Sequence, residues 1–402
     1  MKYANRVSEI LNAFSLAPLK KEDMEEFYCK NTMEYRTSDK YNSPIEDIFD
    51  LCRMEEESSA CLLLGHRGCG KSTELNKMAG RLAACGYHVK TVHCSMDLDL
   101  LSIVYSDLFI LMGEALLQIA KELECEIDRN TLEKIRNFWT EGTETVMIQE
   151  LDALSMEGGM SVGTKGILAG VLDMFAKIKT ELKLNEETRK EYRRKISTRT
   201  SEWIGMLRRV AESIEQKADG KRPIIIFEDL DKLDPESAWK VFYHYAAMLS
   251  GMPFPVIYTF PIALSYDIRF SAMESYFVTK TLPMIKIETI EGEPFSEGIA
   301  VIREIVQKRA ERRDSAVISM EDAQRALEEA KTSLTRRIEE KHYPFLLNIY
   351  QGNKERIADK EMLLHMLQAS VVLEYNGKRW HNVHPLVVKF FEEQGMLGNA
   401  RE

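Results

Sequence analysis

The amino-acid sequence predicts an α/β fold in which a parallel sheet forms the core of the 402-residue chain. Short, wholly apolar runs alternate with long helical patterns, as expected when right-handed crossovers join parallel strands. One apolar run leads directly into a glycine-rich loop and then a helix, which is the order of a phosphate-binding unit. Near the C-terminus the pattern changes to helix, β-hairpin and helix, which is typical of a small winged-helix domain.

These patterns divide the chain into predicted parts. Residues 1–55 form a helical lead-in, and residues 56–290 form the α/β core, with a long helical insertion at about 100–220. Residues 291–342 form a helical lid. Residues 343–402 form the winged-helix-like domain, because the dipeptide Asn-Gly between two β-prone runs is a strong hairpin signal.

The predicted strands of the core are apolar or alternating runs of a few residues, as in a sheet buried on both faces. They are Ala60–Leu64, His88–Cys94, Ile224–Phe227, Pro255–Phe260 and Pro283–Ile287. Within the helical insertion, residues 158–163 predict a flexible break. Residues 186–217 carry Arg, Lys and Glu at helical spacing and predict a solvated amphipathic helix.

The glycine-rich loop after the first strand matches the phosphate-binding P-loop, G-x-x-x-x-G-K-S. Its glycines allow backbone N–H groups to surround phosphate oxygens, Lys71 can reach the β- and γ-phosphates, and Ser72 can hold Mg²⁺. The alternative is a glycine-rich turn with a solvent-exposed lysine. The predicted nucleotide-binding residues are Gly65, His66, Arg67, Gly68, Cys69, Gly70, Lys71, Ser72 and Thr73.

Hydrolysis of a bound nucleotide also needs acids near Mg²⁺ and the attacking water. The apolar run at 224–227 ends in Glu228 and Asp229. We expect Glu228 to contact Mg²⁺ together with Ser72, and Asp229 to polarise the water. The alternative is an acidic helix N-terminus, which the helix dipole favours. Together with the P-loop, this pair predicts ATP and Mg²⁺ as the bound groups, with slow turnover because the longer acid comes first.

Thr259 ends the next strand and is predicted either to sense the γ-phosphate or to form hydrogen bonds with the local backbone.

Cys69 lies before a helix N-terminus, where a thiol can have a lowered pKa, so its oxidation could block phosphate binding. For the neighbouring residues His381 and His384, packing or helix capping is favoured over metal binding.

Charge and composition limit the partners that we expect. The formal net charge of −10 argues against a large basic surface and therefore against general binding to nucleic acid. The seven cysteines are an odd number without C-x-x-C spacing, as expected for free thiols in a reducing cytoplasm. No apolar run is long enough to cross a bilayer, so we expect a cytoplasmic protein without membrane contact.

The residues from Gly65 to Leu75 closely resemble the P-loop of bacterial AAA+-like ATPases related to the STAND and origin-recognition branches. The resemblance extends to Phe27-Tyr28, to the acidic segment 228–233, to the strand 256–261 and to the C-terminal segment 375–387. Two features depart from that family. Glu228 stands where the family usually has Asp, and no glycine occurs between Arg303 and Tyr343, where the family's lid carries a glycine-rich segment ending in arginine.

The resemblance implies a nucleotide-driven switch, read by a protein partner or through self-association, in signalling or in defence against phage. One alternative is a DNA-associated ATPase similar to origin-recognition proteins, although the balanced charge of the C-terminal residues does not support DNA contact. Another alternative is an ATP-binding scaffold that does not hydrolyse ATP.

Overall fold

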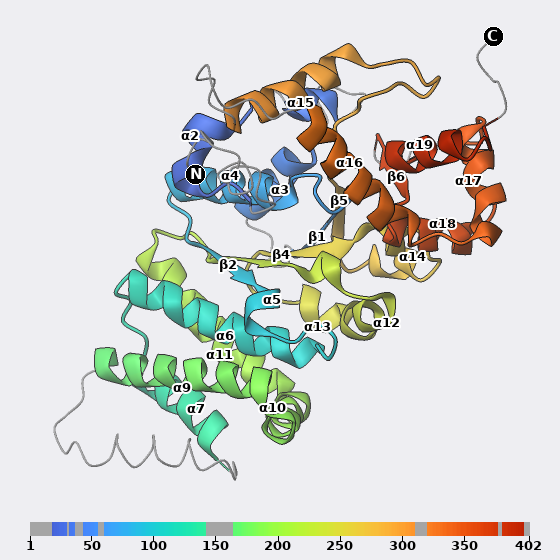
Figure 1. Ribbon diagram of the computed structural model, residues 1–402. Helices are drawn as coiled ribbons and strands as arrows, with labels where there is room; N and C mark the ends of the chain where they lie inside the picture. Colours follow the sequence, from blue (N-terminus) through green and yellow to red (C-terminus); the bar gives the residue numbers. More distant parts are fainter. Residues whose placement is uncertain are drawn as a thin grey trace.

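The computed structural model describes residues 18–29, 32–36, 43–54, 60–141, 164–309, 320–376 and 380–397. Within these ranges, the larger sheet has five strands, all parallel, in the order β2-β3-β4-β1-β5 (Figure 1). The strands are β1 (Ala60–Gly65), β2 (Val89–His93), β3 (Ile224–Glu228), β4 (Val256–Pro261) and β5 (Val278–Thr281). The predicted α/β fold with a parallel core sheet is therefore confirmed.

The last strand of the sheet is not where the sequence predicts it. Residues 283–287 are not a strand, and β5 lies five residues earlier, at 278–281. β5 is an edge strand that pairs with β1, and its side chains are exposed or half-buried. The prediction is wrong because an edge strand does not need the apolar run that marks the buried strands.

Alternate side chains of β1 enter different cores on the two faces of the sheet. Leu62 and Leu64 pack with α6 (Tyr105–Glu122) and α11 (Thr200–Lys217). Cys61 and Leu63 pack instead with α3 (Pro44–Arg53) and α4 (Lys71–Ala84). Figure 1 shows these two pairs of helices on opposite faces of the sheet. The continuous apolar run of β1 thus follows from burial on both faces.

The helical insertion adds a second layer beneath α6. Its further helices are α7 (Arg129–Thr140), α9 (Thr164–Leu184) and α10 (Glu186–Thr198), so this stretch is helical, as the sequence predicts. The charged stretch 186–217 forms two helices, α10 and α11, which bury Tyr192 and Trp203 among other side chains. The predicted break at 158–163 lies outside the described residues. Trp203 fixes this layer by donating its indole N–H to the carbonyl of Phe109, at 3.0 Å.

Short helical turns join the larger elements. They are η1 (Lys21–Asp23), α2 (Met24–Phe27), η2 (Thr32–Tyr35), α5 (Cys94–Asp97), η3 (Leu230–Lys232), α12 (Pro235–Ala238), the π-helical η4 (Trp239–Tyr243), α13 (Ala246–Ser250), η5 (Ile262–Tyr266), α14 (Phe270–Met273) and η6 (Glu340–His342). The first three belong to the predicted lead-in, and η3 follows directly after the acidic strand.

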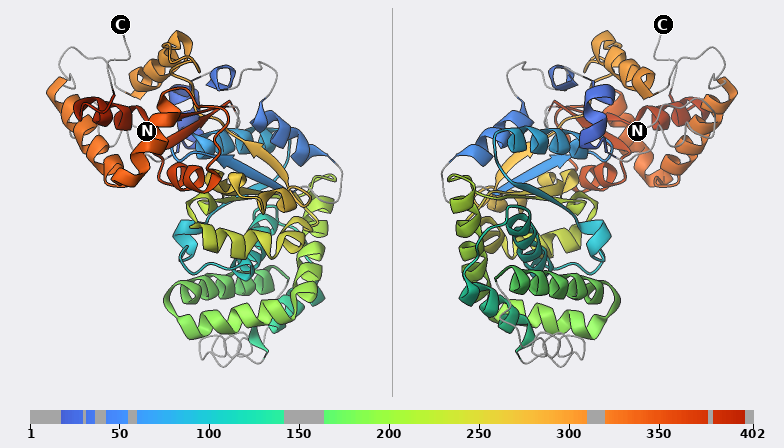
Figure 2. Two further views of the ribbon diagram at one scale, coloured as in Figure 1. Left: turned by 90° about the vertical axis from the view of Figure 1, so that its right-hand side faces the viewer. Right: turned by 90° about the vertical axis from the view of Figure 1, so that its left-hand side faces the viewer.

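Beyond the core the chain is helical until a small C-terminal module, which we define as residues 343–376 and 380–397. The two helices before it are α15 (Ser296–Arg309) and α16 (Met320–Thr335). The module contains α17 (Tyr343–Tyr350), α18 (Lys360–Gln368), β6 (Val372–Tyr375), β7 (Trp380–Val383) and α19 (Pro385–Glu393). Figure 2 shows this module and the α7, α9 and α10 layer at opposite ends of the molecule.

The predicted helix, hairpin and helix are present in the module. β6 and β7 pair antiparallel, with Tyr375 opposite Trp380. Asn376 has the positive φ of 55° that a tight turn needs, whereas the glycine after it lies outside the described residues. The predicted capping role of His384 is confirmed, because its Nδ1 accepts the backbone N–H of Leu386 at the start of α19. Among the described residues, no helix is both long and apolar enough to span a bilayer.

Candidate functional site

The glycine-rich loop curls around the N-terminus of α4. Gly68 and Gly70 have φ of 79° and 99°, in the left-handed region where only glycine is free of strain. At Gly65, an added β-carbon would lie 2.8 Å from the carbonyl oxygen of Leu282. Because α4 begins at Lys71, its unpaired N–H groups face the same loop. The loop therefore has the shape of an anion cradle.

Lys71 lies inside this loop. Its Nζ donates to the carbonyl oxygens of Gly65 and His66, at 2.8 and 2.9 Å, and forms an ion pair with Asp231 Oδ2 at 2.9 Å. Burial alone lowers the pKa of Lys71, but the neighbouring Cys69 and Asp231 outweigh it and raise that pKa above its usual value. The lysine is thus a buried cation that a carboxylate holds near the loop.

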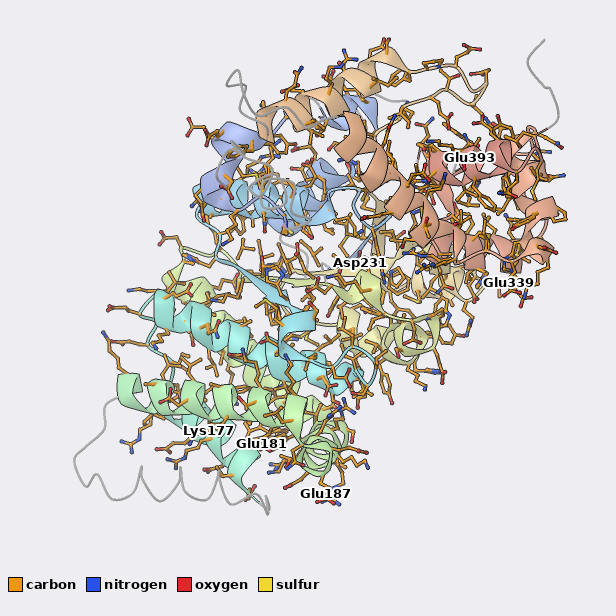
Figure 3. All side chains as sticks on the ribbon, in the orientation of Figure 1. Lys177, Glu181, Glu187, Asp231, Glu339 and Glu393 are labelled. Carbon is orange, nitrogen blue, oxygen red and sulfur yellow. The ribbon has the colours of Figure 1, made fainter. Side chains whose placement is uncertain are left out.

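Asp231 is the residue that sequence reasoning missed. The sequence pointed to Glu228 and Asp229, whereas Asp231, in the 3-10 turn η3, is the carboxylate that contacts Lys71. Figure 3 shows Asp231 near the centre of the molecule, between the sheet and the C-terminal module. The turn arises because Asp229 has a φ of 73°, so the chain reverses directly after β3. The spacing of residues in the sequence does not predict this left-handed conformation at Asp229.

Glu228 ends β3 and is buried, with 2% of its surface exposed. Its Oε2 lies 3.4 Å from Nδ1 of His93, and its Oε1 has no hydrogen-bond partner. A buried carboxylate oxygen without a donor fits the ligand chemistry of a hard cation such as Mg²⁺. Within the described ranges, no three His, Cys, Asp or Glu side chains gather around one point. Mg²⁺ would therefore depend on Glu228, Ser72 and phosphate oxygens.

Asp229 is held by two donors. It accepts a hydrogen bond from Ser95 Oγ at 2.6 Å and forms an ion pair with Lys232 Nζ at 2.5 Å. Burial raises the pKa of Asp229, but the hydrogen bonds from Lys232 and Ser95 outweigh burial and leave that pKa below its usual value. The side chain is a carboxylate, as the predicted water-polarising role requires, and in this conformation Ser95 and Lys232 engage both of its oxygens.

Thr259 bonds local backbone, as one of its two predicted roles requires. Its hydroxyl donates to the carbonyl of Phe227 at 3.3 Å and accepts the N–H of Leu230 at 3.1 Å. It thereby ties β4 to the end of β3 and positions η3. With 1% of its surface exposed, it has no open path to a ligand in this conformation. Contact with a γ-phosphate stays a prediction.

The remaining predicted residues lie on the rim of the loop. Thr73 Oγ1 accepts the backbone N–H of Leu19 at 3.4 Å, and Ser72 is half-buried in the first turn of α4. Arg67 is exposed and donates to the carbonyl of Lys232 at 3.2 Å. Cys69 is 5% exposed, so an oxidant would reach it only when the loop opens; its proposed redox role stays a prediction.

His66 connects the loop to the C-terminal module. Its Nε2 accepts the backbone N–H of Glu374, in β6, at 2.8 Å. The ring is 3% exposed, and burial followed by the charge of Lys71 lowers its pKa to about 3. The imidazole is therefore neutral at pH 7 and has the free lone pair that this hydrogen bond needs.

The hydrogen bond of His66 belongs to a larger buried network. The carboxylate of Glu374 accepts from the hydroxyl of Tyr266 at 2.6 Å, and that hydroxyl also contacts Nε2 of His381 at 2.8 Å. Tyr266 belongs to η5, directly after β4, whereas His381 belongs to β7. The core and the C-terminal module are thus joined by polar groups in addition to apolar packing.

Two cavities without a common lining residue flank the loop. The acid-side cavity, of about 450 Å³, is lined by His66, Arg67 and Asp231 and by residues of the C-terminal region, including Arg337. The helix-side cavity, of about 260 Å³, is lined by Gly68, Gly70 and Thr73 and by residues of the lead-in. A ligand in the loop can therefore extend toward either side.

Arg337 is a second residue that the sequence did not indicate. The chain has no glycine between Arg303 and Tyr343, so no glycine-rich segment marks an arginine there. Arg337 nevertheless lies two residues after the end of α16, lines the acid-side cavity and donates to the carbonyl of Ala369 at 2.9 Å. The position of Arg337 depends on how α16 and α18 pack. A local sequence motif therefore does not predict it.

Neither the family models nor the curated proteins with which the chain was compared give a match. The functional assignment therefore depends on the geometry of this site.

Proposed function

We propose that the chain is a P-loop ATPase of the AAA+-like type that binds ATP with Mg²⁺ and acts as a nucleotide-driven switch. The P-loop follows β1 and the acids follow β3, with β4 between these strands. Ligands of parallel α/β sheets bind beyond the carboxyl ends of the strands, where both segments lie. The cradle around Lys71, the uncompensated Glu228 oxygen and the resemblance of the motifs all support this proposal.

The hydrogen bond from Glu374 to His66 is the observation that carries the switch. His66 lies between Gly65 and the phosphate-binding turn, so phosphate entering the loop acts directly on its backbone. The same residue contacts β6 of the C-terminal module, which we regard as the winged element. Nucleotide that changes the loop would thus change the attachment of the module, and a protein partner or a second copy would detect the difference.

We expect hydrolysis to be slow. Asp229 is engaged by Ser95 and Lys232, and Lys71 is engaged by Asp231. The ion pairs Lys232–Asp229 and Lys71–Asp231 must break before Asp229 polarises water and Lys71 reaches a γ-phosphate. Each rearrangement adds to the barrier without contributing to the chemistry.

Two variants test the proposal against wild type. Mg-ATP at 100 times its dissociation constant would stabilise wild type by about 2.7 kcal/mol, which a thermal-shift assay detects, whereas Lys71→Ala would lose this shift. Hydrogen exchange of residues 371–376 and 380–384 would also change with Mg-ATP in wild type. In His66→Leu, nucleotide would still bind, but the exchange response of that segment would disappear.

Matched variants separate the hydrogen bond from general damage to the loop. Arg67→Leu alters the neighbouring position, whose side chain contacts Lys232 rather than the module, and should keep the response. His66→Gln supplies another acceptor and should restore part of it. If wild type gains no stability from Mg-ATP, nucleotide binding is wrong. If His66→Leu keeps the full exchange response, the switch through His66 is wrong.

A further inference from the structure

The lead-in places a segment beside the P-loop that belongs neither to the P-loop motif nor to the acidic strand. Tyr28 donates its hydroxyl to both carboxylate oxygens of Glu74, at 3.1 and 3.0 Å, and Asn76 Nδ2 donates to the carbonyl of Leu19 at 3.0 Å. Glu74 and Asn76 lie in the first turns of α4. The lead-in is therefore fixed against the helix that carries the phosphate cradle.

Arg36 follows η2 in this segment and is 4% exposed. Its Nη1 donates to the carbonyl of Pro283 at 2.6 Å, whereas its Nε has no hydrogen-bond partner. A β-carbon built on Gly70 would lie 3.2 Å from Arg36 Nη2, so the guanidinium reaches the P-loop itself. In the part of the chain that the structure describes, no ion pair joins Arg36 to a carboxylate. A buried guanidinium without a counter-charge is unfavourable unless an anion completes its surroundings.

The helix-side cavity supplies the place for that anion. Arg36, Gly68 and Gly70 form its polar end at the cradle, and Phe27, Ile302 and Ile305 form apolar walls. Asp231 and the residues that follow it, through Pro235, line the other cavity instead. A nucleotide with its terminal phosphate toward the acids would thus direct its inner phosphates toward Arg36 and its nucleoside toward the apolar walls.

We propose that Arg36 is a nucleotide-binding residue whose guanidinium contacts the inner phosphates, which ADP and ATP share. This inference rests on the proposed function and adds to it a cation from outside the P-loop. Arg36 donates charge-assisted hydrogen bonds through Nε and Nη2, while Nη1 keeps its bond to Pro283 and fixes the plane of the guanidinium. Gly70 is required both for its positive φ and for the space that Arg36 occupies.

The test measures the dissociation constants of ADP and ATP, each with Mg²⁺, by calorimetry for wild type, Arg36→Gln and Arg36→Lys. Loss of charge-assisted hydrogen bonds should weaken ADP and ATP alike, by about 10- to 100-fold, in Arg36→Gln. Arg36→Lys should recover part of the affinity. Arg81→Gln removes an arginine of α4 that pairs with Glu46 outside the cavity and should leave both affinities unchanged.

The melting temperature without nucleotide separates binding from a structural role. It should not fall in Arg36→Gln, because the variant removes an uncompensated buried charge. A lower melting temperature with unchanged affinities would overturn the inference and make Arg36 a structural residue. An effect on ATP alone would also overturn it, because contact would then be with the γ-phosphate. If wild type binds neither nucleotide, both this inference and the proposed function are wrong, whereas binding that Arg36→Gln leaves intact contradicts Arg36 alone.

Discussion

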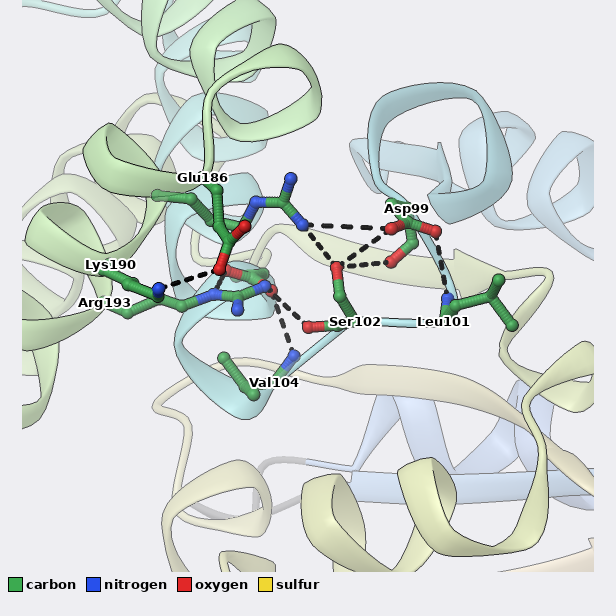
Figure 4. A network of polar contacts seen from close by, with 9 residues as sticks. Asp99, Leu101, Ser102, Val104, Glu186, Lys190 and Arg193 are labelled. Atoms are coloured by element: carbon green, nitrogen blue, oxygen red, sulfur yellow. Dashed lines mark hydrogen bonds and ion pairs between the residues drawn. The ribbon is translucent and has the colours of Figure 1, made fainter.

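Two regions of this molecule differ in whether their buried charged side chains have hydrogen-bond partners. In the helical insertion, Asp107 is surrounded by donors: Arg193 Nε at 2.9 Å, Arg193 Nη2 at 2.6 Å and the backbone N–H of Val104 at 3.0 Å. Figure 4 shows Arg193 and Val104 in this network of polar contacts. At the proposed nucleotide site, Glu228 keeps a buried oxygen without a donor, and Arg36 keeps a buried N–H without an acceptor.

The difference shows what each region is built to do. Asp107 and Glu228 have nearly the same exposure, 1% and 2%, so burial does not distinguish them. What distinguishes them is whether the protein itself satisfies the carboxylate. Buried polar groups in folded proteins normally have partners, and exceptions concentrate where a ligand binds. The protein itself satisfies the Asp107 carboxylate, whereas it leaves polar atoms of Glu228 and Arg36 unsatisfied, as our proposal of a bound cation and anion at that loop requires.

The largest effect that we expect is on the free energy of unfolding, when the ion pair between Arg193 and Asp107 is broken. Arg193→Ala should lower the free energy of unfolding by about 3–5 kcal/mol, because it leaves the Asp107 carboxylate buried without its ion-pair partner. Urea denaturation at pH 7 measures this change. Lys190→Ala, on an exposed pair with Glu186 in the same helix, is the control and should change little. A loss well under 1 kcal/mol in Arg193→Ala would show that the network is not a stabilising one.

The packing of the insertion gives the next effect. A β-carbon at Gly113, in α6, would lie 2.5 Å from Trp203 Cζ2, so Gly113→Ala should destabilise by about 1–3 kcal/mol through overpacking. Gly205→Ala, in α11, is a matched control because nothing lies within 4 Å of its added β-carbon. That variant should be neutral or slightly more stable. Equal denaturation midpoints for both variants would contradict the tight contact between α6 and α11.

A smaller effect, on binding rather than stability, is expected at Lys71. Asp231→Asn removes the carboxylate with which a phosphate must compete for Lys71, so ATP should bind about fivefold more tightly, or about 1 kcal/mol. Calorimetric titration with Mg-ATP measures the change, and Asp234→Asn, at a helix cap farther along the same segment, is the control. Weaker binding in Asp231→Asn would instead place Asp231 among the groups that hold Mg²⁺.

The pH dependence of His93 gives the smallest effect. The hydrogen bond to Glu228 raises the pKa of His93, against the opposing effect of burial. The folded state therefore holds this proton more tightly than the unfolded state, so the pair stabilises the fold fully below about pH 6.5, the usual histidine value. That stabilisation is lost as pH rises through the raised pKa.

Glu228→Gln tests this linkage and the proposed metal contact together. Unfolding measured from pH 5.5 to 8.5 should show a weaker pH dependence in this range than in wild type. The same variant should lose most of the Mg²⁺ requirement for nucleotide binding. Glu186→Gln, whose partner Lys190 is exposed, should change neither property. An unchanged pH profile in Glu228→Gln would mean that His93 does not depend on Glu228.

Local sequence signals were sufficient for the elements that are buried on both sides or closed by a specific turn. β1, β3 and β4 follow from their apolar runs, and the hairpin after Val371 follows from Asn376 and its glycine. β5 could not be predicted, because an edge strand with half-buried Thr and Lys has no apolar signature. The prediction of one amphipathic helix over 186–217 missed the division at Arg199, since both helices are amphipathic.

The sequence by itself determined the parallel α/β core and the phosphate cradle, because glycine conformation, strand burial and helix starts depend on neighbouring residues in the chain. Only the tertiary structure decided which distant side chains meet that cradle. It brings Arg36 from the lead-in, Asp231 through the left-handed turn at Asp229, and Glu374 from the C-terminal module to one loop. Such contacts join residues far apart in the chain. Tertiary packing determines them, and the spacing of residues within a local motif does not predict them.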